Sequence, residues 1–89
     1  MIRVAIVDDD GADRKKIRDC LDFVAEEENQ LFEVSEFENA ECFFMKFDCN
    51  FDIVFLDIEM PYCDGMTAAK RLRQIDKVVT LVFVTNLAQ

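Results

Sequence analysis

The chain has 89 residues, of which 52% are hydrophobic and 33% charged, which fits one small globular domain and excludes a disordered tail. Nineteen acidic residues against ten basic ones give a net charge of −9. Such an acidic surface repels phosphate backbones, so we expect no direct nucleic-acid binding by this segment. No apolar run is long enough to span a membrane, so we expect no membrane partner.

Cysteine usage points to free thiols rather than to a metal site. The sequence has no histidine and no Cys-x-x-Cys pair, so a zinc site is not expected. Met1 leads directly into a strand-like segment without a signal peptide, which favours a cytoplasmic location. We therefore interpret all four cysteines as reduced thiols: Cys20, Cys42, Cys49 and Cys63.

Four apolar segments predict β-strands. Residues 4–7, 53–56 and 78–84 are near-continuous apolar runs, as in strands that are buried on both faces of a parallel sheet. Residues 31–37 alternate between apolar and polar side chains, as in an edge strand with one wetter face.

Between these strands, apolar residues recur at helical spacing in three stripes, which we interpret as core-facing sides of helices. The stripes consist of Ile17, Cys20, Leu21 and Val24; of Ala40, Phe43, Phe44 and Phe47, with Asn39 as N-cap; and of Ala68, Leu72 and Ile75, after Gly65. The β-α-β-α-β-α-β order predicts an α/β fold with a doubly wound parallel sheet and helices on both faces.

The carboxyl ends of the predicted strands carry acidic residues. In open α/β sheets ligands bind at these ends, near the point where the strand order reverses. The first strand ends in Asp8, Asp9 and Asp10, and the third runs into Asp57. If these strands are neighbours, Asp8, Asp9 and Asp57 share one pocket, where each carboxylate raises the pKa of the others and Mg²⁺ would relieve the repulsion. Asp10 can be explained as a helix cap alone.

Three stretches resemble the signatures of receiver domains of bacterial two-component response regulators. They are Val4-Ala5-Ile6-Val7-Asp8-Asp9-Asp10; Phe55-Leu56-Asp57-Ile58-Glu59-Met60-Pro61 with Asp64-Gly65-Met66; and Leu81-Val82-Phe83-Val84-Thr85. The resemblance covers essentially the whole chain, so that residues 1–89 form one receiver domain, and it implies a flavodoxin-like fold. The segment Phe83-Val84-Thr85-Asn86-Leu87-Ala88 is most similar to the branch whose output domains are of the LytTR DNA-binding type.

The resemblance implies a role for each site residue. Asp57 would accept a phosphoryl group from a sensor histidine kinase, and the signal would pass to a transcriptional output domain. Asp9, Asp57 and the backbone carbonyl of Glu59 would ligate Mg²⁺, with Asp8 positioning the metal largely through water. Thr85 would donate its hydroxyl to a phosphoryl oxygen. Such a domain is not a conventional enzyme, apart from self-catalysed phosphotransfer to Asp57 and hydrolysis from it, whose rate the Glu59 side chain would influence.

The sequence also departs from this family. The family has five βα units, whereas this sequence supplies four strands and three clear helices, so we expect a receiver domain that is incomplete at its C-terminus. The family's strand-end lysine has no counterpart, since Lys70 and Lys77 lie elsewhere, and phosphorylation should be slower or absent. Without a fifth strand, the edge from Val78 to Val84 would be apolar and unpaired, and we expect self-association through it.

Two alternatives stay open at this point. A phosphohydrolase of the haloacid-dehalogenase type also uses a strand-end Asp nucleophile, but it would want a second Asp two residues later. Glu59 occupies that position after Asp57, although Asp8 and Asp10 have the spacing. The other alternative is an unphosphorylated receiver fragment that acts only as a protein-interaction or dimerisation module. Mg²⁺-dependent modification of Asp57 separates this module from a phosphoacceptor.

Overall fold

The computed structural model describes residues 1–48, 50–60 and 64–84. Strands and helices alternate along them, as the sequence predicts. In chain order the elements are β1 (Ile2–Val7), α1 (Gly11–Glu28), β2 (Phe32–Phe37), α2 (Ala40–Met45), β3 (Ile53–Asp57), α3 (Gly65–Ile75) and β4 (Thr80–Val84).

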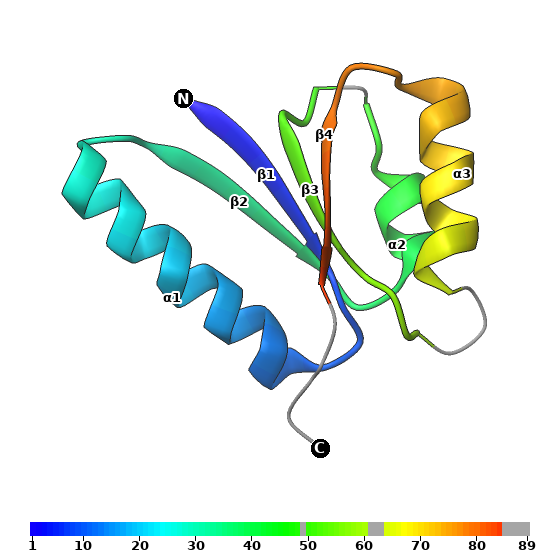
Figure 1. Ribbon diagram of the computed structural model, residues 1–89, viewed down its shortest axis with the longest axis horizontal. Helices are drawn as coiled ribbons and strands as arrows, with labels where there is room; N and C mark the ends of the chain where they lie inside the picture. Colours follow the sequence, from blue (N-terminus) through cyan, green and yellow to red (C-terminus); the bar gives the residue numbers. More distant parts are fainter. Residues whose placement is uncertain (49, 61–63, 85–89) are drawn as a thin grey trace.

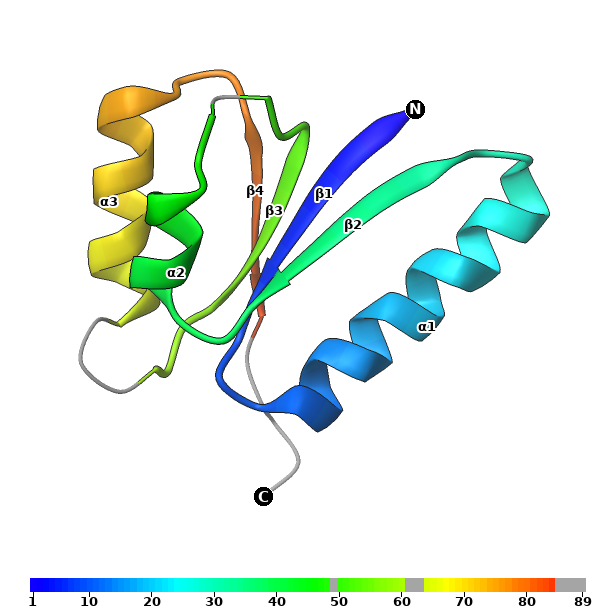
Figure 2. The same cartoon turned by 180° about the vertical axis from the view of Figure 1, so that it is seen from behind.

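The four strands form one parallel sheet in the order β2-β1-β3-β4. Helix α1 covers one face of this sheet, and α2 and α3 cover the other (Figures 1 and 2). The predicted doubly wound α/β architecture is therefore confirmed. The strand order reverses between β1 and β3, whose ends are aligned because Val7 is the register partner of Leu56.

The central strand β1 explains why its sequence is apolar throughout. Its residues from Val4 to Val7 have no exposed surface, because alternate side chains enter two different cores. Val4 and Ile6 pack with Leu21 on the α1 face. The larger core on the opposite face contains Ala5 and Val7 from β1, with Ala40, Phe43, Phe51, Val54, Leu56, Met60, Ala68, Ala69, Leu72 and Val79.

Two details of the sequence interpretation need correction. Strand β4 begins at Thr80 rather than at residue 78, because the carboxylate of Asp76 accepts hydrogen bonds from the amides of Val78 and Val79 at 2.9 and 3.1 Å. This turn takes Val78 out of the strand and leaves it 91% exposed. In addition, Ile75 is exposed, because it is the last residue of α3 and the chain turns away after it.

The predicted apolar stripe of α1 is also only partly buried. Leu21 is buried, whereas Cys20 and Val24 are exposed and line a groove of about 580 Å³ between α1 and β4. Cys20 and Cys42 are free thiols, as expected. The other two cysteines, Cys49 and Cys63, lie outside the described residues. In the described part of the chain, no helix combines the length and apolar character needed to cross a membrane.

Candidate functional site

The carboxylates of Asp8, Asp9 and Asp57 form a cluster at the carboxyl end of the sheet. Asp8 and Asp9 follow the last residue of β1, and Asp57 is the last residue of β3. One carboxylate oxygen from each of the three residues lies within 4.8 Å of those of the other two. The three carboxylates therefore lie together as the sequence predicts, at the point where the strand order reverses.

Burial makes two of these carboxylates unusual acids. Asp8 is 2% exposed and Asp57 is 8% exposed, whereas Asp9 faces solvent. Burial raises the pKa of Asp8 to about 6, aided by the charges of Asp57, Asp13 and Asp9 and opposed by a hydrogen bond from the Asp10 amide. Burial also raises the pKa of Asp57, opposed by the Glu59 amide and aided by the charge of Asp9. Burial therefore disfavours the negatively charged forms of Asp8 and Asp57.

The turn between β1 and α1 is held by its own side chains. The Asp8 carboxylate accepts a hydrogen bond from the amide of Asp10 at 2.9 Å. The Asp10 carboxylate in turn accepts from the amides of Ala12 and Asp13 at 2.8 and 3.4 Å and caps α1. Asp10 is thus a helix cap, as the sequence suggested, and it is not part of the carboxylate cluster.

The segment after β3 positions Asp57. The Asp57 carboxylate accepts a hydrogen bond from the amide of Glu59 at 3.1 Å. The amide of Gly65 donates to the carbonyl oxygen of Ile58 at 2.9 Å, which ties the start of α3 to the end of β3. Asp64 caps α3 by accepting from the amide of Thr67 at 2.8 Å. The Glu59 side chain is exposed, and Thr85 and Pro61 lie outside the described residues.

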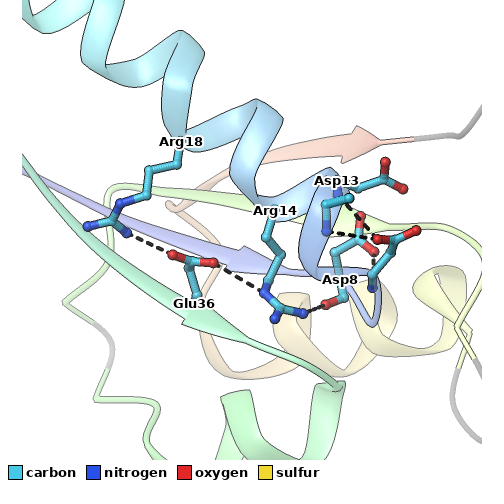
Figure 3. A network of polar contacts seen from close by, with 7 residues as sticks. Asp8, Asp13, Arg14, Arg18 and Glu36 are labelled. Carbon is cyan, nitrogen blue, oxygen red and sulfur yellow. Dashed lines mark hydrogen bonds and ion pairs between the residues drawn. The ribbon is translucent and has the colours of Figure 1, made fainter.

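An arginine that the sequence interpretation missed contacts this site. The guanidinium of Arg14 donates to the backbone carbonyl of Asp8 at 2.6 Å and pairs with Glu36 of β2, as Figure 3 shows. The only signal in the sequence is the position of Arg14 in the first turn of α1. Its partner Glu36 is 22 residues away, so the contact depends on the tertiary fold.

The chemistry of the cluster fits a small divalent cation. Its donors are carboxylate oxygens, which suit a hard ion such as Mg²⁺. None of the salt bridges among the described residues joins Asp8, Asp9 or Asp57 to a lysine or arginine. Burial raises the pKa of Asp8 and of Asp57, so their charged forms are disfavoured unless a positive charge neutralises them. A cation would supply that neutralisation.

The chain is similar to known response regulators. The chain matches the model of the response regulator receiver domain over residues 4–89. It is 35% identical over 90 residues to the sensory transduction protein LytT of Bacillus subtilis (strain 168). This alignment covers 100% of this chain and 36% of LytT. It is 33% identical over 92 residues to the chemotaxis protein CheY of the same organism. This alignment covers 98% of this chain and 69% of CheY.

A solved structure agrees with these matches. The response regulator protein TrrA from Thermotoga maritima, in complex with Mg²⁺–BeF, superimposes with a TM-score of 0.72 at 32% identity, which covers 99% of this chain and 72% of TrrA. The chain spans little more than a third of the length of LytT. The family match, in contrast, covers almost all of this chain and favours a receiver domain over the phosphohydrolase alternative. The chain belongs to the family of response regulator receiver domains, whose general function is to accept a phosphoryl group.

Proposed function

We propose that Asp57 is the phosphoacceptor of this receiver domain and that Asp8, Asp9 and Asp57 hold a Mg²⁺ ion. The observation that carries the proposal is the cluster of three carboxylates, with oxygens within 4.8 Å of one another, at the switch point of the sheet. The raised pKa values of Asp8 and Asp57 support it, because burial makes their charged carboxylates unfavourable unless a cation neutralises them. Asp9 and Asp57 would be direct ligands, and Asp8 would act largely through water.

The reaction is a transfer of a phosphoryl group to a carboxylate. An oxygen of Asp57 attacks the phosphorus atom, the bond from phosphorus to the donor breaks, and the donor leaves with the bonding electrons. The amide of Glu59, which donates to the Asp57 carboxylate at 3.1 Å, orients that group. Mg²⁺ would neutralise the charge that the phosphoryl oxygens bring into the acidic pocket. A carboxylate nucleophile in its charged form carries no proton, so this step needs no general base.

Two further groups are proposed for the same site. The backbone carbonyl of Glu59 would be the third protein ligand of Mg²⁺, and the Glu59 side chain would influence hydrolysis of the acyl phosphate. Thr85 would donate its hydroxyl to a phosphoryl oxygen; it follows Val84, whose Cα is the register partner of Asp57. If Glu59→Ala leaves the rate of dephosphorylation unchanged, the role of that side chain is wrong.

The partners of the reaction follow from the family. We propose that a sensor histidine kinase supplies the phosphoryl group and that a transcriptional output domain responds to it. The similarity to the sensory transduction protein LytT supports a role in signalling. The catalysis would be limited to phosphotransfer to Asp57 and hydrolysis from it. A cytoplasmic location, where such a kinase domain would meet the chain, stays a prediction.

The test is the intact mass of the protein after incubation with Mg²⁺ and a small acyl-phosphate donor. We expect one phosphoryl adduct on the chain and none on Asp57→Asn. Asp22→Asn is the matched control, because it makes the same chemical change at an exposed position of α1. An adduct that persists in Asp57→Asn, or that forms equally well without divalent cations, would contradict the proposal.

A second candidate function is self-association, and the exposed edge of the sheet favours it. Strand β4 pairs only with β3 in the described sheet, so its other side presents unpaired backbone groups. Val82 and Phe83 on this strand are 37% and 40% exposed. We propose that a second copy of this chain pairs along β4 and covers these side chains. This pairing is compatible with phosphorylation of Asp57, and it would be the main activity of a chain that is not phosphorylated.

A further inference from the structure

A short chain of charged contacts connects the edge strand β2 to the turn that carries Asp8 and Asp9. The Arg14 guanidinium donates through Nη1 to the Asp8 carbonyl at 2.6 Å and through Nε to Glu36 at 3.2 Å. The second carboxylate oxygen of Glu36 accepts from Arg18 at 2.9 Å. Figure 3 shows the three side chains in a row between α1 and β2, with the Asp8 carbonyl at one end.

The position of the Arg14 contact matters more than its strength. The carbonyl of Asp8 belongs to the peptide unit that joins Asp8 to Asp9, and a peptide unit is rigid and planar. A hydrogen bond to this carbonyl therefore restricts rotation of the plane that contains the Cα atoms of both residues. The carboxylates of Asp8 and Asp9 extend from these two Cα atoms toward Asp57. Arg14 thus acts on the relative placement of two of the three acidic groups.

Glu36 determines where the Arg14 guanidinium lies. A guanidinium is a planar group with donors in fixed directions, so a carboxylate that binds one edge orients the others. The Arg14 and Glu36 side chains are 21% and 34% exposed, and ion pairs this close to the surface contribute little to folding stability. Gly11 leaves room for the group, since a Cβ there would lie 3.3 Å from Nη2 of Arg14. The arrangement is therefore better suited to orientation than to stabilisation.

We propose that Arg14 is a positioning residue for the Mg²⁺ site and that Glu36 acts on the site through Arg14. The inference rests on the proposed function, because it assumes that Asp8, Asp9 and Asp57 bind Mg²⁺. It adds that the affinity for the ion depends on a contact made outside the pocket. A change in the edge strand β2 at Glu36 would then alter Mg²⁺ binding without touching a ligand.

The test measures Mg²⁺ affinity by titration calorimetry, with no phosphoryl donor present. Partners that orient metal ligands usually change affinity by one to two orders of magnitude, so Arg14→Ala should weaken binding about tenfold. Arg14→Lys keeps the positive charge but lacks the planar fork of donors, so it should recover little or none of the loss. Lys15→Ala is the matched control: it removes a positive charge from the same turn of α1, but Lys15 pairs with Asp19. We expect its affinity to stay within about twofold of the wild type.

A double-mutant cycle separates orientation from general loosening of the fold. Glu36→Ala should weaken Mg²⁺ binding in the wild-type chain and have no further effect in the Arg14→Ala background. Urea unfolding without Mg²⁺ gives the folded fraction of each variant, so that affinities refer to folded protein. If Glu36→Ala weakens binding by the same factor in both backgrounds, Glu36 does not act through Arg14.

Equal affinities of the wild type and Arg14→Ala would overturn the inference while leaving the proposed function intact. Absence of Mg²⁺ binding by the wild-type chain itself would overturn both. A loss in Arg14→Ala that Arg14→Lys does not recover at all would show that the guanidinium geometry, rather than a single donor, is required. That last result would support the orienting role of Glu36.

Discussion

Gly65 at the start of α3 lies against the backbone of Asp57. A Cβ on Gly65 would fall 2.3 Å from the carbonyl oxygen of Asp57 and 2.7 Å from the Cα of Ile58. No glycine in the described residues has a positive φ, so the constraint at this position is close approach rather than backbone conformation. The absence of a side chain at Gly65 allows α3 to begin directly beside the proposed phosphoacceptor.

Gly65→Ala should therefore destabilise the domain. The new methyl group meets backbone atoms that cannot rotate away, and such overpacking costs about 1–3 kcal/mol. Urea unfolding checks the value. Gly11→Ala is the matched control, because the methyl group there meets only the flexible end of the Arg14 side chain, at 3.3 Å. If both variants lose the same free energy of unfolding, the contact with the Asp57 backbone is not the cause of the destabilisation.

The raised pKa of Asp8 predicts how stability depends on pH. The folded state holds this proton up to about pH 6, whereas the unfolded chain releases it near the ordinary value of 3.8. Between these pH values the folded state binds more protons than the unfolded state. In the absence of Mg²⁺, the free energy of unfolding therefore falls as the pH rises from about 4 to 7. One pKa unit corresponds to about 1.4 kcal/mol, and screening by water reduces the full shift, so we expect a loss on the order of 1–2 kcal/mol.

Asp8→Asn removes this contribution and leaves that of Asp57, whose raised pKa acts in the same direction. Asparagine cannot ionise, so the difference in unfolding free energy between the variant and the wild type should grow in favour of the variant as pH rises through 6. Asp48 and Asp64 have lowered pKa values, and their contributions are lost below about pH 4, outside this window. Urea midpoints at several pH values give the curve. A difference that is constant between pH 4 and 7 would contradict the assignment.

Mg²⁺ should stabilise the folded chain through the same cluster. An ion that binds only the folded state at a hundred times its dissociation constant adds about 2.7 kcal/mol. Asp9→Asn should lose most of this gain, because Asp9 is a proposed direct ligand. Asp10→Asn is the control: Asp10 is adjacent and loses the same charge, but asparagine still caps α1. Thermal unfolding with and without Mg²⁺ gives the result, and an equal loss in both variants would point to net charge alone.

The carboxylate cluster could be predicted from the sequence because its members follow directly from local patterns. Apolar runs that end in aspartate place Asp8, Asp9 and Asp57 at strand ends, and the α/β alternation places these ends together. The caps Asn39 and Asp10 are equally local. Arg14 could not be assigned, because its role depends on Glu36, and Glu36 lies beside β1 only through the register that pairs it with Ile6.

Local polar contacts and solvent exposure account for the errors. The run from Val78 to Val84 reads as one strand, but the Asp76 carboxylate binds the amides of Val78 and Val79 and delays the start of β4. Hydrophobicity alone does not show such a turn. In the same way, helical spacing places Cys20 and Val24 on the apolar side of α1, but it cannot show that the sheet beneath them leaves a groove.

The exposed edge of β4 predicts that a lysine will reduce self-association. Val82→Lys places a charge on the strand, and charged side chains discourage edge-to-edge pairing. Phe23→Lys is the control, because it replaces a 63% exposed apolar side chain on α1, away from the strand edge. In light scattering over a range of concentrations, the wild type and Phe23→Lys should show average masses above that of the monomer, and Val82→Lys should stay close to it. A wild type that remains monomeric at every concentration would rule out pairing along β4. If Phe23→Lys reduces self-association more than Val82→Lys does, the contact between copies lies on α1.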